Sequence, residues 1–438
     1  NTCMPSPLPG SCSIALSGSD SGGTGGTAFQ SVTAGTATGG AASASTGGTV
    51  GTGLASGNGG TAPVVATGGN GSTVGGAEAG DGSVGGAAGA SSESPHWAPI
   101  AASPLAARAY HNAVWAGNDQ GVGKLMIWGG YQDGVGTIQE LRDGALYDPR
   151  TDSWSGVSQQ GAPVAHPRAA AVWTGERVLV WGGSNAASSD PWAAYDPTAN
   201  VWEPLPVCPF DDPYTDLPFA TWTGKDLLIL SEGFGIRYDV AKGQWARMAS
   251  TGAPFASGGS AIWTGSQWIV WGGMAANGPE GSGAAYDPAT DQWTPLPVAG
   301  APTPRQNYVA AWTGKYMVIW GGVPVTDAPI YADLLFAYDP VAQTWTQHVV
   351  DAPPESAYGF PVVTTSRAVL VWDGYGASGL PAPVGHALEW QSWTWSALSA
   401  ENQPAPRFHH SATWTGREMI IWGGTSDADL ADGGRFTP

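Results

Sequence analysis

Residues 169–183 read AAAVWTGERVLVWGG, and residues 195–202 read YDPTANVW. The first stretch holds two apolar runs around a Thr-Gly turn, which is the pattern of a β-hairpin whose turn uses the positive φ that glycine adopts readily. The second stretch places an Asp-Pro turn between two further short runs. We therefore expect four antiparallel strands over residues 169–173, 177–181, 193–195 and 201–205.

The same sequence pattern recurs along the chain. Its second tryptophan, or the residue in that place, falls about every 49 residues, at Trp128, Trp181, Leu230, Trp271, Trp320, Trp372 and Trp422. A period in this range is typical of propellers and other repeat arrays. Each small sheet must have both faces covered, and stacking around an axis covers them. The repeat predicts an all-β fold, a seven-bladed β-propeller.

The last copy stops at Pro438, where its fourth strand should begin. The missing strand is found near the other end, because HWAPI at residues 96–100 reads like QWTPL at residues 292–296. We expect the strand around Trp97 to complete the seventh blade and to remove the open edge that the ring would otherwise leave.

Composition divides the chain at about residue 94. Residues 1–94 contain no Lys, Arg or Trp and are dominated by Gly, Ser, Thr and Ala, whereas all 23 Trp lie later. A segment this poor in large apolar side chains cannot offset its ordering entropy. We predict a disordered low-complexity linker or stalk over residues 1–94 and the propeller over residues 95–438.

The charge balance excludes some partners. The formal net charge is −19, with only 12% of residues charged, so phosphate backbones and anionic lipids are repelled and nucleic acid is not an expected partner. No run of 18 apolar residues predicts a transmembrane segment. The low Lys content, the low charge and the long Gly/Ser/Thr tail together predict an extracellular or cell-surface protein. Cys3 and Cys12 lie close together in the tail and could pair in an oxidising compartment.

The repeat resembles the kelch family. The double glycine after the second strand, the Tyr-Asp-Pro turn and a later tryptophan carry the resemblance. They occur as Tyr147-Asp148-Pro149 with Trp154, Tyr195-Asp196-Pro197 with Trp202, Tyr286-Asp287-Pro288 with Trp293, and Tyr338-Asp339-Pro340 with Trp345. The resemblance implies a bacterial-type secreted propeller similar to the central domain of galactose oxidase. It also implies ligand binding on the face that carries the loops between second and third strands.

That face is the variable one. The turns on the opposite face are uniform, whereas the second-to-third loops and the connections between blades differ in length and composition, and variable loops on a rigid scaffold commonly bind ligands. The candidate ligand-binding residues lie in those connections: Arg108, Tyr110, His111, His166, Arg168, Tyr214, Arg305, Tyr308, Tyr358, Arg407, His409 and His410. The alternative interpretation is that they are ordinary scaffold residues bonded to neighbouring backbone.

A copper radical site of the galactose-oxidase type is the sharpest enzyme hypothesis. Tyr110-His111, His410 and Cys208 supply suitable residue types, but the family places its Cys before the Tyr-His pair and here the order is reversed. We therefore predict no catalytic residue, metal or cofactor. The expected function is non-catalytic binding of an extracellular protein or glycan. The alternatives are an enzyme with an axial site on the variable face and a structural surface protein.

Overall fold

A computed structural model describes residues 94–438 except 135–136, 165–168, 183–191, 211–218, 232, 256–258, 276–277, 307, 325–333, 351–360 and 373–384. The chain divides into two units, Asn1–Asn58 and Gly59–Pro438, and all described residues belong to the second. Residues 1–93 of the predicted linker therefore lie outside the described part of the chain.

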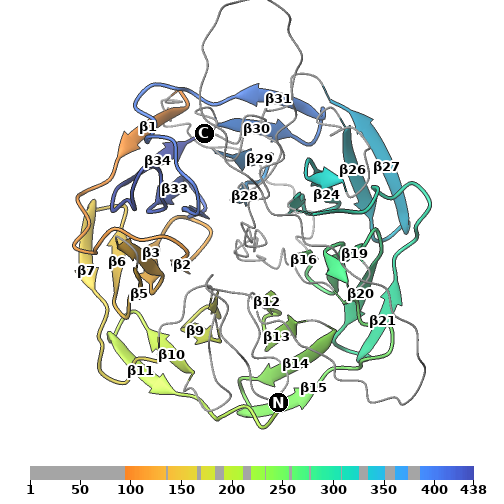
Figure 1. The fold of residues 1–438 in the computed structure, drawn as a ribbon, viewed down its shortest axis with the longest axis horizontal. Coiled ribbons are helices and arrows are strands. Elements are labelled where there is room, and N and C mark those ends of the chain that lie inside the picture. Colours follow the sequence, from red (N-terminus) through yellow and green to blue (C-terminus); the bar gives the residue numbers. More distant parts are fainter. Residues whose placement is uncertain are drawn as a thin grey trace, which may run out of the picture. The chain divides into compact units, whose positions relative to one another are not determined.

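The described residues form 34 strands and no helix, and 28 of the strands make seven four-stranded antiparallel sheets (Figure 1). The first blade consists of β2 (Asn112–Gly117), β3 (Gly123–Trp128), β6 (Gly144–Asp148) and β7 (Ser153–Gly156). The second consists of β8 (Ala170–Trp173), β9 (Val178–Trp181), β10 (Ala193–Asp196) and β11 (Val201–Pro204). In this blade the predicted strands agree with the observed ones to within one residue at each end.

The remaining blades follow the same order. The third consists of β12 (Phe219–Trp222), β13 (Asp226–Ser231), β14 (Phe234–Asp239) and β15 (Gln244–Arg247), and the fourth of β16 (Ser260–Trp263), β17 (Trp268–Trp271), β20 (Gly283–Asp287) and β21 (Gln292–Pro295). The fifth consists of β23 (Val309–Trp312), β24 (Met317–Trp320), β26 (Leu334–Asp339) and β27 (Thr344–Val349). The sixth consists of β28 (Val362–Thr364), β29 (Ala368–Val371), β30 (His386–Glu389) and β31 (Thr394–Ala397).

The seventh blade joins the two ends of the propeller. It consists of β32 (Ser411–Trp414), β33 (Met419–Trp422), β34 (Gly433–Thr437) and β1 (His96–Pro99), with Trp97 opposite Phe436 (Figure 1). The first strands contact one another in the order β2, β8, β12, β16, β23, β28, β32 and back to β2, so the ring is closed. The predicted seven-bladed propeller, closed by the strand around Trp97, is confirmed.

In the described part of the chain, three two-stranded sheets lie beside the blades. They are β4 (Tyr131–Gly134) with β5 (Thr137–Glu140), β18 (Met274–Ala275) with β19 (Gly278–Pro279), and β22 (Arg305–Gln306) with β25 (Val323–Pro324). All three are formed by segments that follow the second strand of a blade or precede its first strand, so they belong to the variable face.

The hydrophobic core lies between neighbouring blades. In six of the seven second strands every residue is buried, because both faces of the strand are covered by adjacent sheets. The tryptophans that precede the double glycines are the largest of these side chains, and Trp128, Trp271, Trp320 and Trp422 are at most 1% exposed. The repeated tryptophan is therefore a packing residue.

A polar contact explains why the Tyr-Asp-Pro turn and the later tryptophan recur. Tyr286 Oη donates to Asp291 Oδ1 (2.7 Å), and the same oxygen accepts the Ala249 N–H from the preceding connection (2.9 Å). Trp293 Nε1 then donates to the Ala249 carbonyl (2.8 Å). The same tyrosine-to-backbone bridge is made by Tyr147, Asp152 and Ala101, and by Tyr195, Asn200 and Ser158. These contacts join the first, second and fourth blades each to the blade before it.

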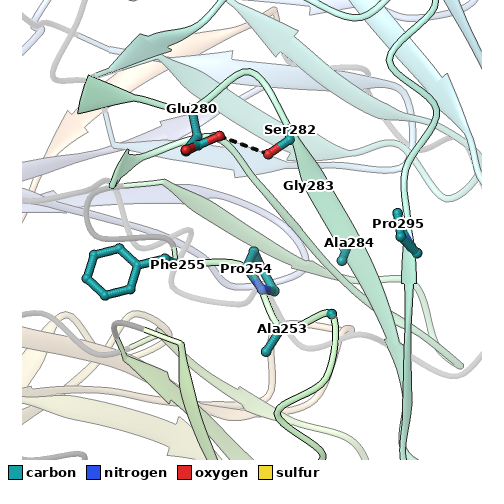
Figure 2. A pocket seen from close by; sticks show the side chains of 10 residues that line it. Ala253, Pro254, Phe255, Glu280, Ser282, Gly283, Ala284 and Pro295 are labelled. Atoms are coloured by element: carbon teal, nitrogen blue, oxygen red, sulfur yellow. Dashed lines mark hydrogen bonds between the residues drawn. The ribbon is translucent and has the colours of Figure 1, made fainter. Parts of the chain in front are cut away.

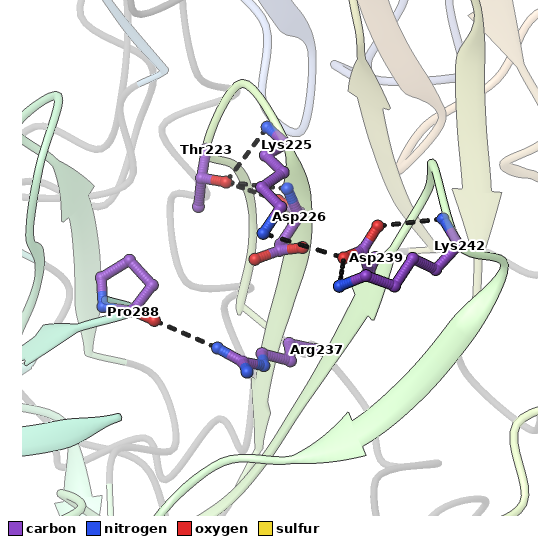
Figure 3. A network of polar contacts seen from close by, with 7 residues as sticks. All are labelled: Thr223, Lys225, Asp226, Arg237, Asp239, Lys242 and Pro288. Atoms are coloured by element: carbon purple, nitrogen blue, oxygen red, sulfur yellow. Dashed lines mark hydrogen bonds and ion pairs between the residues drawn. The ribbon is translucent and has the colours of Figure 1, made fainter. Parts of the chain in front are cut away.

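The uniform turns also hold blades together (Figure 3). In the third blade, Thr223 Oγ1 donates to the Asp226 carbonyl across the turn (3.1 Å). From the same blade, Arg237 Nη1 donates to the Pro288 carbonyl of the fourth (3.1 Å). Side chains on this face are therefore used for turns and for contacts between blades, as the uniformity of the sequence there predicts.

Candidate functional site

Three of the candidate arginines are buried beneath the variable face. Arg108 and Arg407 have no exposed surface, and Arg305 is 2% exposed. Each donates through Nε to the carbonyl two residues earlier and through Nη1 to a carbonyl of the double-glycine turn. The acceptors are Ala106 and Gly129 for Arg108, Thr303 and Gly321 for Arg305, and Ala405 and Gly423 for Arg407, at 2.8–3.1 Å. This geometry supports the scaffold interpretation of the three arginines.

Two of these arginines also bind a carboxylate. Arg108 Nη2 lies 2.9 Å from Asp143 Oδ1, and Arg407 Nη1 lies 3.0 Å from Asp432 Oδ1. Burial lowers the pKa of Arg108, and Asp143 opposes that shift. The guanidinium groups thereby fix the loops that follow β3 and β33.

Three further candidates pack against the preceding blade. His111 lies edge-on to Trp422 (4.9 Å between ring centroids), His410 to Trp372 (5.4 Å) and Tyr308 to Trp271 (5.1 Å). Tyr308 also donates its hydroxyl to the Trp271 carbonyl, and His111 Nε2 bonds Ser411 Oγ (2.9 Å). Burial lowers the pKa of both His111 and His410 to about 3, so both imidazoles are neutral at physiological pH.

The remaining described candidates form a stack of rings on the variable face. Tyr110 stacks on His409 (4.2 Å between centroids, 28° between planes) and on Tyr131 (5.0 Å, 23°). Phe408 lies beside His409 at 6.3 Å. All four are partly exposed. We call Tyr110, Tyr131 and His409 the ring platform.

Two residues of the platform have a left-handed backbone conformation. Tyr110 and His409 both have a φ of 53°, in the left-handed region, which six other non-glycine residues of the described part of the chain also adopt, among them Gln343 and Trp393 in turns. Each lies two residues after a buried arginine, and the corresponding position after Arg305 is occupied in the sequence by Asn307, a residue type that tolerates this region.

The seam between the seventh and first blades holds the platform in place. Arg108 N donates to the Leu430 carbonyl (3.0 Å), and Gly424 N donates to the Arg108 carbonyl (2.9 Å). Ala109 and Tyr131 exchange both of their backbone hydrogen bonds (2.9 and 3.0 Å). These bonds fix the ring positions before any ligand arrives, which reduces the entropy cost of binding.

The sequence-based list of candidates is thus divided by the structure. Arg108, Arg305, Tyr308, Arg407 and His410 are buried and His111 is partly buried, and all six bond or pack within the fold; only Tyr110 and His409 belong to the platform. His166, Arg168, Tyr214 and Tyr358 lie outside the described residues. Ligand contact stays a prediction for all of them. Tyr131 was not among the candidates, although its place directly after the first Trp-Gly-Gly was a usable signal.

The described ranges contain no group of three or more His, Cys, Asp or Glu side chains placed to hold a metal ion. Within the same ranges, no helix has the length and apolar character needed to cross a membrane. No protein-family model matches this chain, and no curated protein sequence matches it.

Proposed function

We propose that this chain is a kelch-type propeller, secreted or displayed on the cell surface, that binds an extracellular ligand without catalysis. Between the two ligand classes suggested by the sequence, a protein and a glycan, we favour a glycan. The variable face is the proposed binding face, and no cofactor is required.

The ring platform is the observation that carries this proposal. Backbone hydrogen bonds between the seventh and first blades hold Tyr110 and His409 in position, and the two rings stack on one another. The stacked rings are only partly covered and offer both aromatic surface and polar edges, which suits the C–H faces and hydroxyl groups of a sugar.

The surroundings of the platform favour a small neutral ligand. Asp427 is exposed in the loop after β33, where backbone hydrogen bonds join Thr425 to Phe408, and the exposed Asp432 of the same loop pairs with Arg407. Carboxylates accept hydrogen bonds from hydroxyl groups and repel anionic ligands. None of the large apolar side chains that are strongly exposed in the described part of the chain lies in the platform loops, so a broad apolar protein interface has little support there.

The test is binding of the full chain to a glycan array. Tyr110→Asn and His409→Asn remove a ring but keep a residue that tolerates the left-handed conformation, and we expect each to weaken binding at least tenfold. Tyr316→Asn is the matched control, because Tyr316 is also partly exposed but belongs to a uniform turn. Equal binding by all variants would refute the proposal that the ring platform binds the ligand. Absence of binding by the unchanged chain would refute the proposal that the ligand is a glycan.

A further inference from the structure

We propose that a cavity in the fourth blade is a second saccharide-binding subsite, separate from the ring platform; this inference rests on the proposed glycan-binding function. The cavity has a volume of about 310 Å³ (Figure 2). Its walls come from the connection between β15 and β16 (Gly252, Ala253, Pro254 and Phe255), from Gly272, Glu280 and Ser282, from Gly283 and Ala284 of β20, and from Pro295 at the end of β21. It therefore opens on the variable face.

One wall of the cavity carries an exposed aromatic ring. The Phe255 side chain is 44% exposed, although a phenyl ring gains free energy from burial. Its Cδ2 atom lies 3.6 Å from where a Cβ would stand on Gly233, so one part of the ring approaches the turn of the third blade. Phe255 lines the cavity, and the electron-rich face of a phenyl ring attracts the partly positive C–H groups of a sugar.

A carboxylate and a hydroxyl group lie on another side of the cavity. Ser282 Oγ donates to Glu280 Oε2 (3.1 Å), and Figure 2 shows this pair at the top of the view, with Phe255 and Pro254 below. Glu280 N donates to the Gly273 carbonyl (2.8 Å), which fixes the backbone that carries the carboxylate. An ionised carboxylate only accepts hydrogen bonds, so the ligand must supply donors, as sugar hydroxyl groups do.

The blade itself fixes the shape of the cavity. Gly283 at its floor has no room for a side chain, because a Cβ there would lie 2.5 Å from the Val270 carbonyl oxygen. The adjacent backbone is held by the hydrogen bond from Gly272 N to the Ser282 carbonyl (2.9 Å). A preformed site with one aromatic and a few polar groups is the usual construction of a small-ligand pocket.

Size and charge narrow the ligand class. The volume is near the lower limit of roughly 300–1,000 Å³ for ligand pockets, which suits one or two sugar rings. Glu280 and the net charge of −19 disfavour uronic and sialic acids. The inferred ligand is thus a neutral saccharide that lays a C–H face on Phe255 and donates a hydroxyl hydrogen to Glu280.

The experiment is titration calorimetry of the full chain with methyl glycosides of neutral hexoses. We expect Phe255→Ser and Glu280→Gln each to weaken binding about tenfold, the usual worth of one charged hydrogen bond or one aromatic contact. Phe234→Ser is the matched control, because Phe234 is exposed to a similar degree (49%) but does not line the cavity. Unchanged melting temperatures would show that the variants fold.

The outcomes separate this inference from the proposed function. Loss of binding in Phe255→Ser but not in Tyr110→Asn supports the subsite. Loss in Tyr110→Asn alone refutes the subsite and leaves the platform. Equal binding by Phe255→Ser and Phe234→Ser also refutes the subsite. No heat with any glycoside refutes the subsite, and the glycan array then decides the platform.

Discussion

Replacement of Trp97 by alanine tests how the ring is closed. Trp97 belongs to β1, the only strand of the seventh blade that comes from the N-terminal side, and is 2% exposed. Its indole lies 5.5 Å from the Trp372 ring and 5.2 Å from the Phe436 ring, so it joins the sixth blade to the seventh. Its removal weakens the contact that fixes β1 in the ring.

The expected loss follows from the buried area. A tryptophan buries about 150–250 Å², which at about 25 cal/mol per Å² corresponds to roughly 4–6 kcal/mol. The indole Nε1 has no hydrogen-bond partner among the described residues, and that unpaired group lowers the gain by about 1 kcal/mol. We therefore expect Trp97→Ala to lower the free energy of unfolding by about 4 kcal/mol, within the usual range for such substitutions.

Differential scanning calorimetry measures this loss. With an unfolding entropy of about 2.1 cal/mol/K per residue over roughly 340 residues, 4 kcal/mol corresponds to a decrease in Tm of about 6 °C. Trp97→Phe should keep most of the stability, and Val341→Ala, at a side chain that is 93% exposed, should change it by less than about 0.5 kcal/mol. A Tm for Trp97→Ala within 1 °C of the unchanged chain would show that β1 does not hold the ring closed.

Two further predictions concern the buried polar groups. In the folded chain the pKa of His111 and of His410 is lowered to about 3, so below pH 6.5 the unfolded chain binds more protons than the folded chain. The free energy of unfolding should therefore be highest above pH 6.5 and fall as the pH is lowered toward 3. The slope is at most about 1.4 kcal/mol per pH unit for each histidine. Urea midpoints between pH 4 and 7 measure this slope, which should decrease in His111→Gln. Arg407→Met should lower the free energy of unfolding by about 3 kcal/mol, because it leaves the Gly423 and Ala405 carbonyls without a donor; a urea midpoint equal to that of the unchanged chain would refute this role.

The repeat is the part of this protein that sequence reasoning could resolve. Trp-Gly-Gly and Tyr-Asp-Pro recur with a fixed order, so the number of blades, the strands of the second blade and the closing strand at Trp97 all followed from spacing. The hydrogen-bonded bridge through Asp291 could not be predicted from the spacing, although it is the reason that the tyrosine and the tryptophan recur together. Its partner is a backbone N–H more than 40 residues away, and no local pattern records such a contact.

The sequence by itself determined which segments form blades, because periodic burial leaves a periodic pattern of apolar residues, turns and glycines. Only the tertiary structure decided which polar residues of the connections are buried and which reach the surface. Arg108 and Tyr110 are two residues apart, yet one is enclosed among loop carbonyls and the other stacks on the variable face. The connections have no repeating period, so the position of each side chain there depends on loops contributed by the neighbouring blade. That dependence is why the ring platform and the Phe255 cavity became visible only in the folded chain.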